Sequence, residues 1–166
     1  RMRVIFERKS TRTFSDRKVE EEKVEKLLRA AMAAPSAGNQ QPWEFYVVED
    51  KDMLEKISGS SPYAGPAKNA PFAIVVCYRK NGKFPECIPL DLSAVSQNIL
   101  LEVEYLGLGA VWLAVYPSTD RMGKMKHILD LPNELEAFSI IPCGYAAIIR
   151  EKVQDRFDKA RIHYLK

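Results

Sequence analysis

The sequence is short of the residues that most often build metal and thiol sites. Its 166 residues include only two histidines and three cysteines, and no two cysteines form a C-x-x-C pair. We therefore expect no metal site and no disulfide framework. The chain also lacks any run approaching the roughly 20 apolar residues of a membrane-spanning helix, and it has no apolar N-terminal signal region. We accordingly expect no membrane partner and take the cytoplasm as the default location.

A large excess of one charge sign is missing as well. The chain has 25 Lys and Arg residues against 22 Asp and Glu residues, so its net charge is +3, and the two signs alternate along the sequence. So small an excess does not by itself indicate a nucleic-acid partner. The hydrophobic fraction of 46% is ordinary for a globular protein. We interpret residues 1–166 as a single domain that is long enough to bury a core.

The most distinctive stretch that is present is a cluster of cations and hydroxyls near the N-terminus. It reads Arg8-Lys9-Ser10-Thr11-Arg12-Thr13-Phe14, and no apolar period runs through it. A guanidinium matches phosphate oxygens as a planar fork, and Ser or Thr adds a short donor. The cluster is therefore suited to hold a phosphate while a second cation faces a neighbouring group. On these residues alone, a solvated basic turn or a nucleic-acid patch is an open alternative.

Periodicity predicts strands and helices that are intermingled along the chain. Apolar runs predict strands, and stripes at helical spacing predict helices. We expect a cap at Ser15-Asp16 for the second helix and a cap at Asp91 for the fourth, whose apolar residues predict burial nearly all round. The order indicates a sheet covered by helices, in the α+β or α/β range. The predicted helices are 3–7, 18–34, 50–58, 91–106 and 120–129, the predicted strands are 44–48, 72–78, 110–115 and 138–143, and residues 59–71 are expected to form a long mobile loop.

Two further stretches carry information about a site and a partner. The loop from Ala34 to Trp43 reads Ala-Pro-Ser-Ala-Gly-Asn-Gln-Gln-Pro-Trp, so it offers amides and an aromatic ring where a plain connector would carry charges. The tail 151–166 is charged and weakly patterned, and it cannot bury much surface on its own. Such a tail either frays or packs on something else, such as a second subunit.

Taken in order, these pieces closely resemble one known family. The cluster at Arg8–Arg12 comes first, the loop at Ala34–Trp43 second, and the stretch from Asn98 to Leu113 third, followed by Ile141-Pro142-Cys143-Gly144-Tyr145 and by Arg156-Phe157-Asp158. This ordered set resembles the nitroreductase family of flavin mononucleotide (FMN) enzymes over nearly the whole chain. The resemblance implies a three-layer α+β fold with a central mixed or antiparallel sheet, and an intertwined homodimer with two FMN sites at its interface.

The resemblance also assigns roles to particular residues. The phosphate and ribityl end of FMN would be held near the N-terminus, and Arg12 would lie near N1 and the C2 carbonyl of the flavin ring. The loop after the second helix would contact the ring, from the other subunit. The implied cofactor-binding residues are Arg8, Lys9, Ser10 and Arg12, then Pro35, Ser36 and Asn39, then Val111, Trp112 and Leu113 along the cofactor, and Arg156 returning to the phosphate.

The function that the resemblance implies is an FMN-dependent oxidoreductase. NADH or NADPH would reduce the flavin by hydride transfer, and a nitroaromatic, a quinone or a similar small electrophile would then take two electrons in a ping-pong reaction. A fixed cation such as Arg12 beside N1 stabilises the negative charge of a reduced flavin. The alternatives are a reductive dehalogenase, a flavin-fragmenting enzyme, or a flavin store or sensor without catalysis.

Overall fold

The fold is organised around a central strand, β2 (Phe72–Arg79), which is buried on both faces. The computed structural model of the protein describes residues 3–148 and 155–166. Within them β2 pairs with β1 (Trp43–Val48) on one side and with β5 (Leu135–Gly144) on the other. Two short strands, β3 (Gly109–Ala110) and β4 (Leu113–Ala114), also pair with β5. All of these named strand pairs are antiparallel, which confirms the antiparallel form of the predicted α+β sheet.

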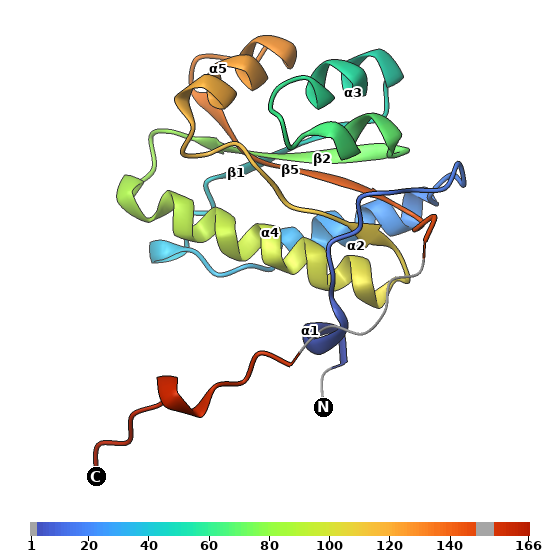
Figure 1. Cartoon of the computed structure of the whole chain (residues 1–166). Helices are drawn as coiled ribbons and strands as arrows, with labels where there is room; N and C mark the ends of the chain where they lie inside the picture. The colour runs from blue at the N-terminus through green and yellow to red at the C-terminus, as the bar shows by residue number, and fades with distance from the viewer. Residues whose placement is uncertain (1–2, 149–154) are drawn as a thin grey trace.

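Two layers of helices cover the sheet, as Figure 1 shows. On one face lie α2 (Glu21–Met32) and α4 (Ile88–Tyr105), and on the other lie α3 (Lys51–Ser58) and α5 (Thr119–Ile128). The three-layer arrangement predicted from the sequence is therefore confirmed. Shorter helices complete the described chain: α1 (Arg3–Glu7) and the single turns η1 (Ala37–Asn39), η2 (Gly65–Asn69), η3 (Pro85–Cys87) and η4 (Lys159–Arg161).

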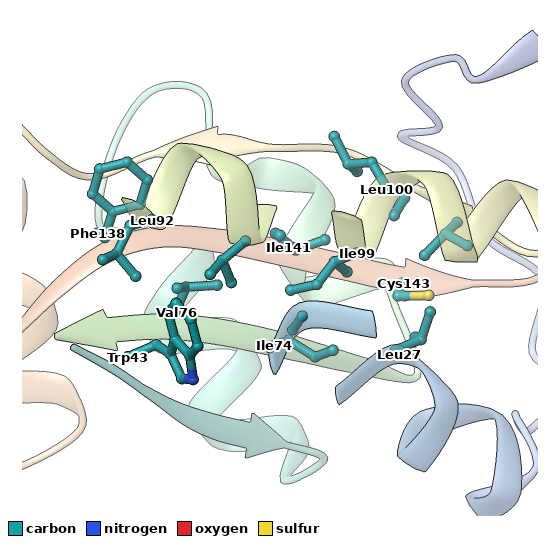
Figure 2. Packing of buried hydrophobic residues seen from close by; sticks show 14 of the residues in the cluster. Leu27, Trp43, Ile74, Val76, Leu92, Ile99, Leu100, Phe138, Ile141 and Cys143 are labelled. Carbon is teal, nitrogen blue, oxygen red and sulfur yellow. The ribbon is translucent and has the colours of Figure 1, made fainter. Parts of the chain in front are cut away.

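The continuous apolar run of β2 follows from this layering. Successive side chains of a strand point to opposite faces, so a strand covered on both sides is apolar at every position. Ile74 and Val76 pack toward α2 and α4, while Val75 packs toward α3 and α5. Figure 2 shows the first of these two cores, in which Ile99 of α4 and Leu27 of α2 close over the sheet.

A bulge in β5 interrupts the alternation at one point. The register shifts between Val76 and Cys77, which pair with Ser139 and Ala137 and leave Phe138 as the extra residue. The ring of Phe138 thereby joins the core on the α4 side, and the hydroxyl of Ser139 meets that of Ser96 of α4 at 3.0 Å. Bulges of this kind re-aim side chains near functional sites.

Several predicted boundaries were wrong in detail. The second helix begins at Glu21 with Glu20 at its N-cap, so Ser15 and Asp16 do not cap it. The predicted strand 110–115 is two short strands separated by residues 111 and 112. The predicted mobile loop 59–71 contains η2, whose Ala67 is fully buried against α3 and the sheet. In each case tertiary contacts decided the local structure where propensity left it open.

The fourth helix also differs from the prediction at its start and on its outer face. It begins at Ile88, so Asp91 lies in its first turn and Cys87 stands at the N-cap. The helix is buried along one face only, because Leu90 is 70% exposed and Tyr105 is 73% exposed. The prediction that this helix is buried on nearly all sides is therefore wrong for a single chain. The outer face of α4 is exposed in the described chain.

Candidate functional site

The N-terminal basic segment, Arg8–Arg12, lies against the edge strand β3. Ser10 forms a parallel bridge with Ala110, and the backbone N–H of Thr11 donates to the carbonyl oxygen of Ala110 at 2.8 Å. Gly109 permits this close approach, since a Cβ atom there would lie 2.6 Å from Cγ2 of Thr11. The contact brings the basic segment beside residues 111–113, as the predicted site requires.

The cations of the basic segment form no ion pair among the residues that the structure describes. Within residues 3–148 and 155–166, the side chains of Arg8, Lys9 and Arg12 make no hydrogen bond or ion pair. Arg8 and Lys9 lie near Glu104 in the last turn of α4. Burial raises the pKa of its carboxyl group above the ordinary 4.5, while Lys9 and Arg8 lower it and Glu7 raises it. Arg8 and Lys9 lie near one acid and form no ion pair among the described residues, so their surroundings favour an added anion.

Residues 111–113 are split between the two cores. The side chains of Val111 and Leu113 are buried toward α3 and α5. Trp112 is half-buried on the other face, and its ring lies 6.0 Å from that of Phe138. If this stretch runs along a cofactor, Val111 and Leu113 can offer it only their backbone groups, whereas Trp112 can also offer its side chain.

The loop that contains Pro35, Ser36 and Asn39 has an unusual backbone. Asn39 has a φ of 52° and the next residue but one, Gln41, has a φ of 46°. Two side-chain bonds hold this turn: the hydroxyl oxygen of Ser36 accepts from the Gln41 backbone N–H at 3.0 Å, and Oδ1 of Asn39 accepts from Nε2 of Gln41 at 2.9 Å. Ser36 and Asn39 thus keep a fixed orientation, and Pro35 is exposed beside them.

Within one chain this loop lies far from the basic segment. The loop is bonded to Asp91 in the first turn of α4, whereas Arg8 and Lys9 lie near Glu104 in its last turn. At 1.5 Å per residue, the 13 positions between them correspond to roughly 20 Å. Arg156 belongs to residues 155–166, an exposed C-terminal arm that runs away from the body in Figure 1. One chain therefore brings Arg8–Arg12 and residues 111–113 together, and leaves the loop with Pro35, Ser36 and Asn39 apart from them.

The sequence as a whole matches a known family. The sequence model of the Nitroreductase family matches residues 5–62 and 60–145. The chain belongs to the nitroreductase family. A curated relative from Archaeoglobus fulgidus, named as a candidate NADH dehydrogenase/NAD(P)H nitroreductase, is 43% identical over 98% of this chain and 95% of its own length.

Solved structures of other nitroreductase-like proteins share the fold. A candidate NADH oxidase from Clostridium acetobutylicum is 47% identical, with a TM-score of 0.95 over 98% of this chain and 99% of its own. A candidate nitroreductase from Desulfovibrio desulfuricans, solved in complex with FMN, is 26% identical, with a TM-score of 0.83 over 99% of this chain and 95% of its own. These likenesses confirm the fold that the resemblance predicted.

The donors on this nitroreductase-family chain fit the phosphate end of FMN. Arg8 and Lys9 are half-buried cations without a partner among the described residues, and the Ser10 hydroxyl follows them directly. A phosphate takes bidentate contacts from an arginine and point-charge contacts from a lysine. The edge of the sheet beside them, at Ala110, is held in place by the backbone bond from Thr11.

Sequence reasoning missed the contact between Asp91 of α4 and Gln40 of the loop. Asp91 was expected to cap its own helix, yet its carboxylate accepts from the backbone N–H of Ala37 at 2.9 Å and from Nε2 of Gln40 at 2.7 Å. Asp91 is 5% exposed. An aspartate in the first turn of a helix is so common that its position in the sequence carries no sign of this role.

Other features lie outside the predicted site. A hollow of about 840 Å³ is lined by residues 13–18, by α3 and by residues 68–71, and none of the predicted site residues lines it. In the described part of the chain, no group of three or more His, Cys, Asp or Glu residues is placed to hold a metal ion. No described helix has both the length and the apolar character needed to cross a membrane.

Proposed function

We propose that this protein is an FMN-dependent oxidoreductase that accepts a hydride from NAD(P)H and delivers two electrons to a small electrophilic acceptor. Nitroaromatics and quinones are the acceptor classes we favour. The observation that carries the proposal is the group of three cations, Arg8, Lys9 and Arg12, which lack partners within the described residues and lie against β3. The FMN-bound structure of a family member at 26% identity supports FMN as the ligand.

Each residue group has a separate part in this reaction. When bound, FMN supplies the hydride chemistry, and the protein supplies position and electrostatics. Arg8, Lys9 and Ser10 bind the phosphate, with Arg156 as a further cation. Arg12 places a permanent positive charge at the N1 and C2 end of the ring. Pro35, Ser36 and Asn39 orient the ring, and the stretch containing Trp112 lies along the cofactor.

We further propose that two copies of the chain share each site, as an intertwined homodimer. The loop and the basic segment lie at opposite ends of α4, so a second chain is the simplest source of the missing half. An apolar groove of about 400 Å³ between α1, α2 and α4 is open in one chain, lined by Val4, Ala30, Ala33, Asn98, Leu101, Glu102 and Tyr105. The arm has apolar side chains to cover such a surface, among them Tyr164, 79% exposed, and Leu165, 99% exposed.

In this proposal residues 1–166 act as one FMN-binding domain, and residues 151–166 form its C-terminal arm. Residues 151–154 lie outside the described residues, and 155–166 are exposed throughout. NAD(P)H and the acceptor would use the same open pocket in turn, which is the arrangement that a ping-pong reaction needs. We place this reaction in the cytoplasm, without nucleic-acid or membrane partners.

Anaerobic reduction of the FMN-loaded protein tests this function. We expect NADH or NADPH to bleach the visible flavin absorbance, and a nitroaromatic or quinone added afterwards to restore it. Protein that binds no FMN would contradict the proposal. Bound FMN that neither nicotinamide reduces would instead favour a store or sensor. A halogenated phenol belongs in the acceptor panel, because release of halide would favour the reductive dehalogenase alternative.

A further inference from the structure

A buried carboxylate joins the ring-facing loop to the helix layer. Asp91 is 5% exposed, and no Lys, Arg or His within residues 3–148 and 155–166 forms an ion pair with it. Its two oxygens accept from two donors of the same loop, the Ala37 N–H on Oδ1 at 2.9 Å and Nε2 of Gln40 on Oδ2 at 2.7 Å. A buried charge of this kind persists only where hydrogen bonds compensate its desolvation.

The amide of Gln40 extends this contact to a third segment. Its Nε2 also donates to the carbonyl oxygen of Phe84 at 3.1 Å, and its Oε1 accepts from the Phe84 backbone N–H at 3.0 Å. Both backbone groups of Phe84 thus fix which way the amide faces. Gln40 therefore ties the loop to α4 through Asp91 and to the connector after β2 through Phe84.

The loop needs such ties because its backbone is strained. Asn39 and Gln41 have φ values of 52° and 46°, a region that residues with side chains occupy at a cost, whereas Gly38, at 54°, occupies it without one. The ring of Phe84 also occupies the place that a Cβ atom on Gly38 would need. Strained conformations persist when the surrounding structure over-determines them, and they gather at functional sites.

We propose that Asp91 and Gln40 are positioning residues that together form a clamp for the flavin-ring loop. The clamp holds Pro35, Ser36 and Asn39 in the one conformation that can meet the ring. This inference rests on the proposed function, and it adds two residues that touch neither the phosphate nor the ring. It also makes the segment around Phe84 a structural support of the ring-binding half of the site.

The chemistry of the clamp explains why a carboxylate stands at position 91. Two donors converge on it, and an ionised carboxylate can accept from both. An asparagine of the same size has one accepting atom and one donating group, so it can satisfy only one of the two donors. Asp91→Asn should therefore break the clamp although it preserves shape and volume. Gln40→Met removes the other half of the clamp at similar volume, from a half-buried loop position.

Titration of the apoprotein with FMN and with riboflavin tests the proposal. Riboflavin has the same ring but no phosphate, so it separates ring positioning from phosphate binding. We expect Asp91→Asn and Gln40→Met each to weaken the binding of both ligands by the same factor, roughly tenfold, because each variant leaves a buried polar group unsatisfied. The ratio of the two affinities should stay at its wild-type value.

The double variant and a matched control complete the test. In Asp91→Asn with Gln40→Met, the asparagine need only accept from Ala37, so the double variant should bind no more weakly than Gln40→Met alone. The control is Ser96→Ala, which breaks the buried bond to Ser139 on the same helix, away from the loop. We expect its flavin affinities to stay within about twofold of wild type.

Distinct outcomes separate the clamp from the proposed function. If wild-type protein binds neither ligand, the proposed function fails. If wild type binds FMN and Asp91→Asn binds both ligands as wild type does, the clamp is wrong. The clamp is equally wrong if the loss is confined to FMN, if the two single losses add in the double variant, or if Ser96→Ala loses as much affinity as Asp91→Asn.

Discussion

Two groups of cations near the N-terminus differ in what surrounds them. Arg17 donates to Glu20 at 3.2 Å and lies 3.8 Å from the centre of the Tyr145 ring, while Nζ of Lys23 donates to the Tyr145 hydroxyl at 2.7 Å. Arg8, Lys9 and Arg12 have no such side-chain bonds within the described residues. The first group is neutralised by the fold that it helps to hold. We propose that the second group binds a ligand, so substitutions in the first should affect stability and substitutions in the second should affect ligand binding.

The comparison extends to Arg156 of the C-terminal arm, the fourth cation that we assign to FMN. Deleting residues 151–166 should abolish dimerisation and FMN binding together, because the deletion removes both the arm and Arg156. Obligate interfaces bury on the order of 2,000–5,000 Å², and without one the monomer should have no independent stability. Sedimentation velocity, recorded at protein and flavin wavelengths, measures both losses at once.

A substitution within the intact arm is the control for that deletion. Arg156→Ala should stay dimeric and lose only part of its FMN affinity. A truncated protein that sediments as a folded, yellow monomer would show that the arm and the site are independent.

Removing one cation that forms no ion pair among the described residues should weaken FMN binding and leave the stability of the fold nearly unchanged. For Arg8→Ala we expect FMN affinity to fall roughly tenfold or more, since a charge-assisted bond contributes about 1.5–3 kcal/mol. The free energy of unfolding of the apoprotein should change by less than about 0.5 kcal/mol. Arg17→Ala is the matched control, with unchanged FMN affinity. If both variants lowered FMN affinity equally, the proposal that only the basic segment binds FMN would be wrong.

Arg12 should act on the electronics of the cofactor. Arg12→Gln should lower the two-electron reduction potential of bound FMN, because it removes a positive charge that stabilises the reduced ring. An interaction of about 1.5–3 kcal/mol corresponds to roughly 30–65 mV for a two-electron couple. Spectroelectrochemistry of wild type and variant gives the difference directly. A potential that is unchanged within error would mean that Arg12 does not face the ring.

The smallest expected effect is on stability, it concerns the group in which Arg17 and Lys23 contact Glu20 and Tyr145, and it depends on pH. The Tyr145 hydroxyl, which donates to Glu20 at 2.7 Å, is the largest cause that lowers the pKa of Glu20 from 4.5 to about 2. A lowered carboxyl pKa contributes stability that is present above pH 4.5 and is lost as pH falls toward 2. Urea midpoints of wild type and Tyr145→Phe should therefore differ at pH 6 and converge as pH falls. If the difference between the two urea midpoints did not change with pH, the lowered pKa of Glu20 would not be its cause.

Much of the fold could be predicted from the sequence because its strongest signals are periodic. The run 72–78 indicated a strand buried on both faces, and α3 (Lys51–Ser58) lies within one residue of the predicted 50–58. Asp50 caps α3 by accepting from the Met53 N–H at 2.8 Å. The weaker predictions failed where contacts distant in sequence decide the structure. The bulge at Phe138 and the break between β3 and β4 depend on pairing with β5, which no local pattern reveals.

The candidate site was predictable in its parts and not in its connections. The basic segment was found from its composition, and its place beside residues 111–113 is now explained by the Thr11 bond to Ala110. The clamp formed by Asp91 and Gln40 joins residues 51 positions apart in sequence. Sequence spacing alone could not show that pairing, because helix caps and loop amides have many possible partners.

The central claim is that the unpaired cations of the basic segment bind the phosphate of FMN, and a paired titration tests it most directly. Wild-type apoprotein and Arg8→Ala are each titrated with FMN and with riboflavin, and flavin fluorescence is followed. We predict that wild type binds FMN at least roughly tenfold more tightly than riboflavin, and that this preference collapses in Arg8→Ala while riboflavin affinity stays the same. Equal affinity of wild type for the two ligands, or an undiminished preference in Arg8→Ala, would contradict the claim.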